Sequence, residues 1–152
     1  MPWSHGGRSH TSAAGLGLAA VDTAAAAAGQ YRVDAAAVAD QYYLVDGEHR
    51  LSLSARYGLF TLRAGSAPAI HGACTAPQQR VVVHADSAEF NRQGRNAFCK
   101  FVLECDPDLR CQDECLVVTE SDELVAVGKL KVAPAEIVLG QQGLAVKVRE
   151  AV

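Results

Sequence analysis

Residues 80–102 read RVVVHADSAEFNRQGRNAFCKFV. The β-branched run at the start of this stretch predicts a strand, and the polar residues that follow predict a helix. Asp86 can cap that helix while Glu89 reaches back as in a capping box, and Gly94 can end it. Residues 98–103 are apolar again and predict a second strand. The stretch is therefore expected to form a strand, a short helix and another strand.

Short strands are also predicted in the rest of the second half. Apolar runs at residues 115–118, 124–127 and 144–148 predict three of them, and polar turn residues separate the runs. Five or six short strands with one inserted helix are typical of a compact mixed barrel, because closing the sheet removes its exposed edges. We therefore predict a small β-barrel domain.

The first half has a different pattern. Residues 15–40 are rich in alanine and predict one or two helices, with Asp34 capping a short helix that runs to Asp40. Beyond residue 40, short β-rich runs around the Asp46-Gly47 turn predict an antiparallel meander. Residues 64–79 hold two prolines and two glycines and predict a connector. The expected organisation is an α+β protein with a flexible amino-terminal segment over residues 1–14, a small α/β domain over residues 15–79 and the barrel domain over residues 80–152.

Length and composition limit the classes of protein that this chain can represent. The chain has 152 residues, 49% of them hydrophobic, which suits one ordinary domain or two small ones. No apolar run is long enough to span a bilayer, so no membrane association is expected. The net charge is −3, so the chain has no general attraction for nucleic acid and any such site must be a local patch.

The five cysteines favour reduced thiols. Their number is odd, and the amino end lacks the apolar centre of a secretory signal, so we expect a cytoplasmic protein. That amino end has some resemblance to a transit peptide, although a frayed chain start explains it as well. The cysteine spacings do not match the pairs that hold zinc, and burial as small apolar residues explains Cys99, Cys105 and Cys115. We expect no metal and no cofactor.

Charge is unevenly distributed along the second half. Residues 104–123 contain eight acidic residues and one basic residue, so that region should repel phosphate. Positive charge gathers at three other places, which a barrel could bring together beside Lys100. These places are Arg92 with Arg95, Lys129 with Lys131, and Lys147 with Arg149.

Five segments of the second half share a recognisable pattern and spacing. They are GRNAFCKFV at residues 94–102, DPDLR at 106–110, DECLVV at 113–118, ELVAVG at 123–128 and GLAVKVR at 143–149. Together they resemble the PUA domain of archaeosine tRNA-guanine transglycosylases. Residues 42–49 and 57–62 are similar to the small α/β domain that precedes PUA in the same enzymes. One departure lies at Cys111-Gln112, where the family usually has Pro-Gly, so this chain lacks the preset turn at that loop.

The resemblance implies an RNA groove lined by the turn after the helix and by the last strand. With the neighbouring cations added, the expected RNA-binding residues are Arg92, Gly94, Arg95, Asn96, Lys100, Lys147 and Arg149. The alternative is that these are ordinary solvated charges and that Gly94 only ends a helix. Tyr42, Tyr57 and Phe60 could stack on bases, although aromatic residues in a meander are more often part of a core.

The resemblance also implies what kind of activity to expect. The transglycosylase's catalytic barrel would need roughly 250 further residues, so we expect no enzyme, and His71 and His84 belong to no recognisable catalytic motif. The predicted partner is structured RNA rather than DNA, namely the acceptor end of tRNA. The protein would work alone or beside a separate catalytic transglycosylase subunit in tRNA modification. One alternative is a ribosome-associated or translation-related adapter. Another is an enzyme or small-ligand binder, which would need a deep polar pocket with a titratable pair.

Overall fold

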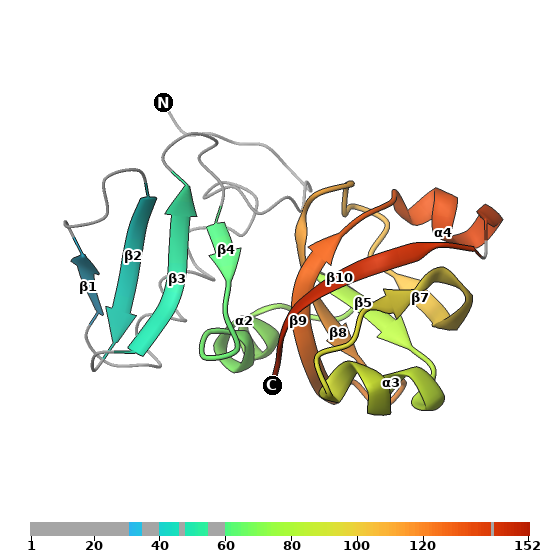
Figure 1. The fold of residues 1–152 in the computed structure, drawn as a ribbon, viewed down its shortest axis with the longest axis horizontal. Coiled ribbons are helices and arrows are strands. Elements are labelled where there is room, and N and C mark those ends of the chain that lie inside the picture. The colour runs from blue at the N-terminus through green and yellow to red at the C-terminus, as the bar shows by residue number, and fades with distance from the viewer. Residues whose placement is uncertain (1–30, 35–39, 46–47, 55–59, 141) are drawn as a thin grey trace.

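The protein, seen in a computed structural model, is described over residues 31–34, 40–45, 48–54, 60–140 and 142–152. Figure 1 shows two sheets side by side, with helix α2 between them. In the described residues the first sheet has the order β1-β2-β3-β4, and each strand is antiparallel to its neighbour. Its strands are β1 (Tyr31–Asp34), β2 (Asp40–Val45), β3 (Glu48–Ser54) and β4 (Phe60–Leu62).

This sheet confirms the predicted meander and corrects the predicted helices. Val45 pairs with Glu48, so β2 and β3 form the expected hairpin, whose Asp46-Gly47 turn lies outside the described residues. Tyr31–Asp34 were expected within the helical region but form β1, and Asp40 begins β2 instead of ending a helix. Tyrosine and valine in β1 favour a strand once β2 provides a partner for its backbone. Residues 1–30 and 35–39 lie outside the description.

Helix α2 (Ala67–Ala73) occupies the segment that was expected to be a connector. Pro68 does not prevent it, because a proline in the first turn of a helix removes no intrahelical hydrogen bond. Ala67 and Ile70 are its buried residues, and they pack against the outside of the second sheet. The prolines and glycines were therefore wrongly interpreted as breaks throughout this segment.

The second sheet has six strands in the described residues, in the order β6-β10-β9-β8-β5-β7. β5 and β8 are parallel, and every other neighbouring pair is antiparallel. β6 and β7 lie at opposite edges, yet the short 3-10 turn η1 joins them directly, so the sheet curls into a nearly closed barrel (Figure 1). The elements are β5 (Arg80–Val83), α3 (Ala85–Arg92), β6 (Ala97–Phe98), η1 (Cys99–Phe101), β7 (Val102–Cys105), β8 (Glu114–Val118), β9 (Leu124–Leu130), α4 (Pro134–Gly140) and β10 (Leu144–Ala151).

The barrel confirms the predicted fold, with two local differences. The strand expected over residues 98–103 is interrupted by η1, which turns the chain from one edge of the sheet to the other. Helix α4 was not predicted, because it has only seven residues and buries only Ile137, which leaves no repeating apolar pattern in the sequence. The domain boundary near residue 79 stays a prediction.

Helix α3 ends as predicted but begins differently. The side chain of His84, not that of Asp86, caps its start by accepting a hydrogen bond from the Asp86 N–H. At the other end Gly94 has φ +80°. The N–H groups of Gly94 and Arg95 donate to the carbonyls of Asn91 and Phe90, which is the Schellman arrangement that ends helices with glycine.

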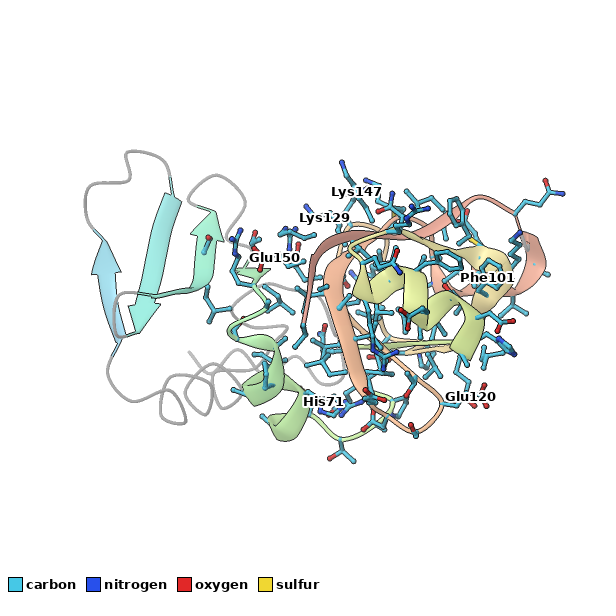
Figure 2. All side chains as sticks on the ribbon, turned by 60° about the horizontal axis from the view of Figure 1, so that its bottom comes forward. His71, Phe101, Glu120, Lys129, Lys147 and Glu150 are labelled. Carbon is cyan, nitrogen blue, oxygen red and sulfur yellow. The ribbon has the colours of Figure 1, made fainter. Side chains whose placement is uncertain are left out.

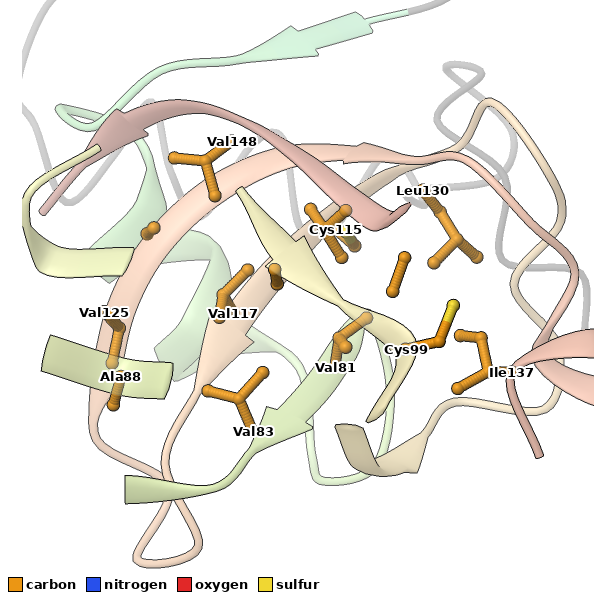
Figure 3. Close-up of a cluster of buried hydrophobic side chains, with 14 of the residues drawn as sticks. Val81, Val83, Ala88, Cys99, Cys115, Val117, Val125, Leu130, Ile137 and Val148 are labelled. Carbon is orange, nitrogen blue, oxygen red and sulfur yellow. The ribbon is translucent and has the colours of Figure 1, made fainter. Parts of the chain in front are cut away.

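The barrel sheet buries apolar side chains on both faces. The inner face contributes Val81, Val83, Val117, Val125 and Val146 to the core shown in Figure 3. On the outer face, Leu116, Val118 and Val127 pack against Leu51, Leu62, Ala67 and Ile70 of the first sheet and α2. This second apolar layer joins the two parts of the described chain.

A polar contact reinforces that layer at the end of β4. The Leu62 N–H donates to Glu114 Oε2 at 3.1 Å, and the Leu62 carbonyl accepts from Arg149 Nη1 at 3.1 Å. Arg149 also donates through both terminal nitrogens to the two oxygens of Glu114, at 2.6 Å for the Nη2 contact. We call Leu62, Glu114 and Arg149 the junction clamp. The Ala64 N–H donates to Glu150 beside it at 2.7 Å.

Candidate nucleic-acid interface

The turn from α3 into β6 is the first part of the candidate interface. A Cβ on Gly94 would meet open space, so the positive φ, and not crowding, favours glycine there. The carbonyl of Arg95 accepts from Asn91 Nδ2 at 3.0 Å, which ties the turn back to the helix. Asn96 Oδ1 accepts from the N–H of Val148 at 3.0 Å, which ties it forward to β10. The turn is thus fixed beside β10.

Arg95 is exposed on this turn and has no ion-pair partner among the described residues. Its guanidinium carbon lies 5.8 Å from the centre of the Phe90 ring, and Phe90 is itself 52% exposed. A cation placed over an aromatic face keeps its charge available to an approaching anion. Arg95 can therefore contact phosphate without breaking another charge pair.

Two lysines extend this positive surface across β9 and β10. Lys147 pairs directly with Lys129 in the sheet, so both side chains leave the same face. Figure 2 shows them close together at the top of the view. Like charges placed opposite each other destabilise a sheet unless a counter-charge is near, and here Glu114 of β8 lies opposite Lys129 on its other side. No salt bridge joins either lysine to a carboxylate in the described part of the chain. We call Arg95, Lys129 and Lys147 the cationic face.

Backbone packing keeps the two lysine-bearing strands close together. A Cβ on Gly128 would lie 2.4 Å from the Lys147 carbonyl oxygen and 2.9 Å from the Val148 Cα. Only glycine allows this approach of β9 to β10. The spacing between Lys129 and Lys147 therefore depends on Gly128. Lys129 was grouped with Lys131 in the sequence but was not expected among the RNA-binding residues, since its cross-strand partner could not be read from the pattern.

The other expected RNA-binding residues occupy different places. Lys100 is exposed in η1, with its Nζ 4.8 Å from the centre of the Phe101 ring. Arg92 pairs with Glu123 at 2.7 Å on the surface, which partly neutralises it. Arg149 belongs to the junction clamp and lies between the two parts of the chain. The structure thus places Asn96 against β10, the strand that carries Lys147, and Arg95 on the same turn as Asn96, while Arg92 and Arg149 are engaged with carboxylates.

The charge of Arg149 is maintained by its partner. Burial lowers the pKa of this guanidinium, but the hydrogen bonds and charge of Glu114 outweigh burial and raise that pKa above its ordinary value. The Glu114 side chain is only 2% exposed. A bidentate pair of this kind is already neutral as a unit, so it offers little attraction to phosphate.

The thiols and histidines do not assemble a reactive centre among the described residues. No group of three or more potential metal ligands occurs in the described part of the chain, and the five cysteines are free. Cys99 and Cys115 are buried as expected, and Cys105 is half-buried. Burial first, and Asp106 second, raise the pKa of Cys105 to about 12, so its thiol stays protonated.

One histidine has a partner that its sequence position did not reveal. His71 Nε2 lies 3.2 Å from Asp122 Oδ1, and Arg80 Nε lies 2.7 Å from the same oxygen. The hydrogen bond from Arg80 lowers the pKa of Asp122, burial opposes it, and His71 lowers that pKa further. This group links α2 to the turn between β8 and β9, which gives it a structural role.

Residues 79–152 match the family model of the PUA domain. The carboxyl-terminal half of this chain is a PUA domain. Its nearly closed mixed barrel, with the helix inserted after the first strand, agrees with that assignment. The described residues contain no helix long and apolar enough to cross a membrane.

Curated relatives support the resemblance seen in the sequence. A tRNA-guanine(15) transglycosylase of Thermococcus kodakarensis is 43% identical over 106 residues, which are 70% of this chain and 18% of that enzyme. The corresponding enzyme of Methanocaldococcus jannaschii is 51% identical over 73 residues, or 48% of this chain and 11% of the enzyme. The chain thus spans less than a fifth of the length of these relatives.

Solved structures share the fold over more than the PUA domain. A conserved PUA domain protein from Thermoplasma acidophilum has a TM-score of 0.60 at 16% identity and covers 80% of this chain and 75% of its own. A hypothetical protein from Pyrococcus horikoshii has a TM-score of 0.62 at 17% identity and covers 80% of this chain and 73% of its own. These likenesses concern the fold and extend into the part that precedes residue 79.

Proposed function

We propose that this protein binds structured RNA through the cationic face of its PUA domain. The observation that carries the proposal is that Arg95, on the turn fixed beside β10, and Lys129 and Lys147, opposite each other on β9 and β10, form no salt bridge with a carboxylate in the described residues. Phosphate contacts supply most of the affinity in such complexes, and charges that are already paired add little. The relatives, named as tRNA-guanine(15) transglycosylases, support tRNA as the RNA.

We further propose that the bound part of tRNA is its acceptor end. The positive surface is small, so it suits a short segment of backbone better than a long helix. The protein would act without a catalytic centre of its own, either as a stand-alone module or beside a separate catalytic transglycosylase subunit, in the cytoplasm. An adapter role in translation remains the alternative if binding is not selective for tRNA.

The experiment is a binding titration of the full chain with a fluorescent tRNA transcript at low salt. The same transcript without its four 3′-terminal nucleotides and a hairpin of equal length provide the comparison. We expect the intact tRNA to bind most tightly. Equal affinity for all three RNAs would favour a general adapter, and no binding would overturn the proposal.

A matched pair of variants tests the surface itself. Arg95→Gln removes one charge from the cationic face, whereas Arg110→Gln removes one exposed charge from the acidic region. We expect the first variant to weaken tRNA binding about tenfold, the effect of 1.4 kcal/mol, and the second to change it little. Equal effects of the two changes would show that net charge, and not this surface, governs binding.

A further inference from the structure

An open groove lies on the outer face of the barrel, over strands β5 and β7. Its volume is about 630 Å³. Val82 lies in its floor and pairs across the sheet with Glu104 of β7 and Val118 of β8. Leu103 and Glu104 line one side, and the turn between β8 and β9 lines the other with Glu120 and Asp122.

The groove continues the apolar layer that joins the two parts of the described chain. Helix α2 and the end of β4 cover Leu116, Val118 and Val127, and Val82 packs at the border of that cluster. Beyond this border no described residue covers the sheet face, and Leu103 is 50% exposed. Apolar side chains on an open sheet face lose contact with water when another chain covers them, which favours binding there.

The charges around the groove restrict what can bind. Asp122 already forms salt bridges with Arg80 and His71, so its charge is largely neutralised within the protein. Glu104 and Glu120 are exposed and have no cationic partner among the described residues. Two such carboxylates repel phosphate. An uncharged chain would displace the water bound to them without offering a compensating charge, which is unfavourable. The complementary ligand is therefore basic.

The groove also lies away from the cationic face. Figure 2 shows Glu120 at the opposite side of the barrel from Lys129 and Lys147. Occupation of one surface would leave the other accessible, so the groove is independent of the proposed RNA site. A small polyamine would satisfy the two carboxylates but would leave Val82 and Leu103 uncovered.

We propose that this groove binds an extended segment of a partner protein in which basic and apolar residues alternate. The basic side chains lie between Glu104 and Glu120, and the apolar side chains cover Val82 and Leu103. This arrangement pairs both carboxylates and buries the exposed leucine in one contact. The same chain could then hold RNA on one surface and a protein on another.

The test is an NMR titration of the full ¹⁵N-labelled protein with the acetylated peptide GSKLRLKSG. We expect shifts of the backbone amides of Val82, Leu103, Glu104 and Glu120, with a Kd below about 1 mM, and no shifts at Gly94 or Lys147. Peptides with the basic residues replaced by glutamate, or the leucines by serine, should bind at least tenfold more weakly. Spermine and tRNA serve as the competing ligands.

Charge-matched variants complete the test. Glu104→Gln with Glu120→Gln should weaken peptide binding at least tenfold, whereas Glu89→Gln with Asp108→Asn removes the same charge elsewhere and should leave it unchanged. The proposal is overturned if both pairs have the same effect, or if the peptide shifts only residues outside the groove. The proposal is also overturned if spermine binds the groove as tightly as the peptide does, or if tRNA displaces the peptide. Either result would identify a different class of ligand. None of these outcomes depends on whether tRNA binds the cationic face.

Discussion

Arg149 binds both carboxylate oxygens of Glu114, and together the two side chains hold the N–H and the carbonyl of Leu62. One partner comes from β8 and the other from β10, while Leu62 ends β4 of the other sheet. The junction clamp therefore fixes the first sheet on the outside of the PUA barrel. Because the charge of Arg149 is paired within the protein, we leave this residue out of the proposed RNA surface.

Breaking the junction clamp should cost considerable stability. Arg149→Met leaves the buried Glu114 without its cation, and such a loss typically costs about 3 kcal/mol or more in free energy of unfolding. Arg92→Met, which breaks the exposed pair with Glu123, should cost less than about 1 kcal/mol. Chemical denaturation of both variants measures the difference. Adding Glu114→Gln to Arg149→Met should recover part of the loss, and a double variant as unstable as the sum of the two single ones would contradict the coupling.

The salt dependence of tRNA binding separates the cationic face from the junction clamp. With three or four phosphate contacts, the slope of log affinity against log salt should be about −2 to −4. Lys147→Gln should make that slope less steep by about 0.7 to 0.9, the share of one contact. Arg149→Gln should leave the slope unchanged under conditions in which the variant is folded. Measuring the affinity of each variant between low and physiological salt gives these slopes. A less steep slope for the Arg149 variant would show that Arg149 contacts the RNA.

Two glycines should respond differently to the same substitution. Gly128→Ala places a Cβ against the backbone of β10, so the strands must separate, and overpacking of this kind typically costs about 1–3 kcal/mol. Gly94→Ala meets no atom but must adopt a positive φ, at a cost of about 1–2 kcal/mol. Gly94→Asn should recover part of that loss, because asparagine tolerates the left-handed region, whereas Gly128→Asn should be worse than alanine. Thermal unfolding measures all four variants, and rescue of both positions by asparagine would contradict this explanation.

The Asp122 contact should show a specific dependence on pH. Its pKa is lower in the folded protein than its ordinary value of 3.8, chiefly through the hydrogen bond from Arg80. The contact therefore stabilises the fold fully above that ordinary value and loses its effect as the pH falls through the lower, folded-state pKa. The difference in free energy of unfolding between the wild type and Asp122→Asn should be constant near neutral pH and should shrink below about pH 4. A difference that shrinks between pH 8 and 6 would point to another group.

The cysteines should differ sharply in reactivity. Burial raises the pKa of Cys115 well above its ordinary value, and Cys105 and Cys74 are shifted in the same direction for the same main reason. Cys111 is exposed, with its thiol donating to the Lys131 carbonyl at 3.0 Å. A thiol reagent at pH 8 should therefore modify Cys111 first in the native protein, and Cys111→Ser should remove that fast phase. A fast reaction that persists in this variant would show that a buried thiol is accessible.

Local signals in the sequence predicted the barrel well but missed contacts between distant residues. Gly94 was predicted to end a helix because the requirement for a positive φ is local, and the β2–β3 hairpin was predicted from the Asp-Gly pair in the sequence, which is also a local signal. Helices α2 and α4 were missed because each has seven residues and little apolar periodicity. The pairing of Arg149 with Glu114 could not be predicted because the two residues are 35 positions apart in the chain. Lys129 was left out because its pairing with Lys147 depends on the register of β9 against β10.

The position of β10 between β6 and β9 also affects how the domain can form during synthesis. Helix α3 is local and can form as soon as it leaves the ribosome, but β6 has no other strand partner in the described sheet. β5 can pair with β7 earlier, but its parallel pairing with β8 must wait, since 30 residues lie between these two strands. The barrel therefore cannot close until its last strand has emerged. Until then, the apolar strands that come earlier in the chain stay exposed, and a chaperone that binds nascent chains would find them there.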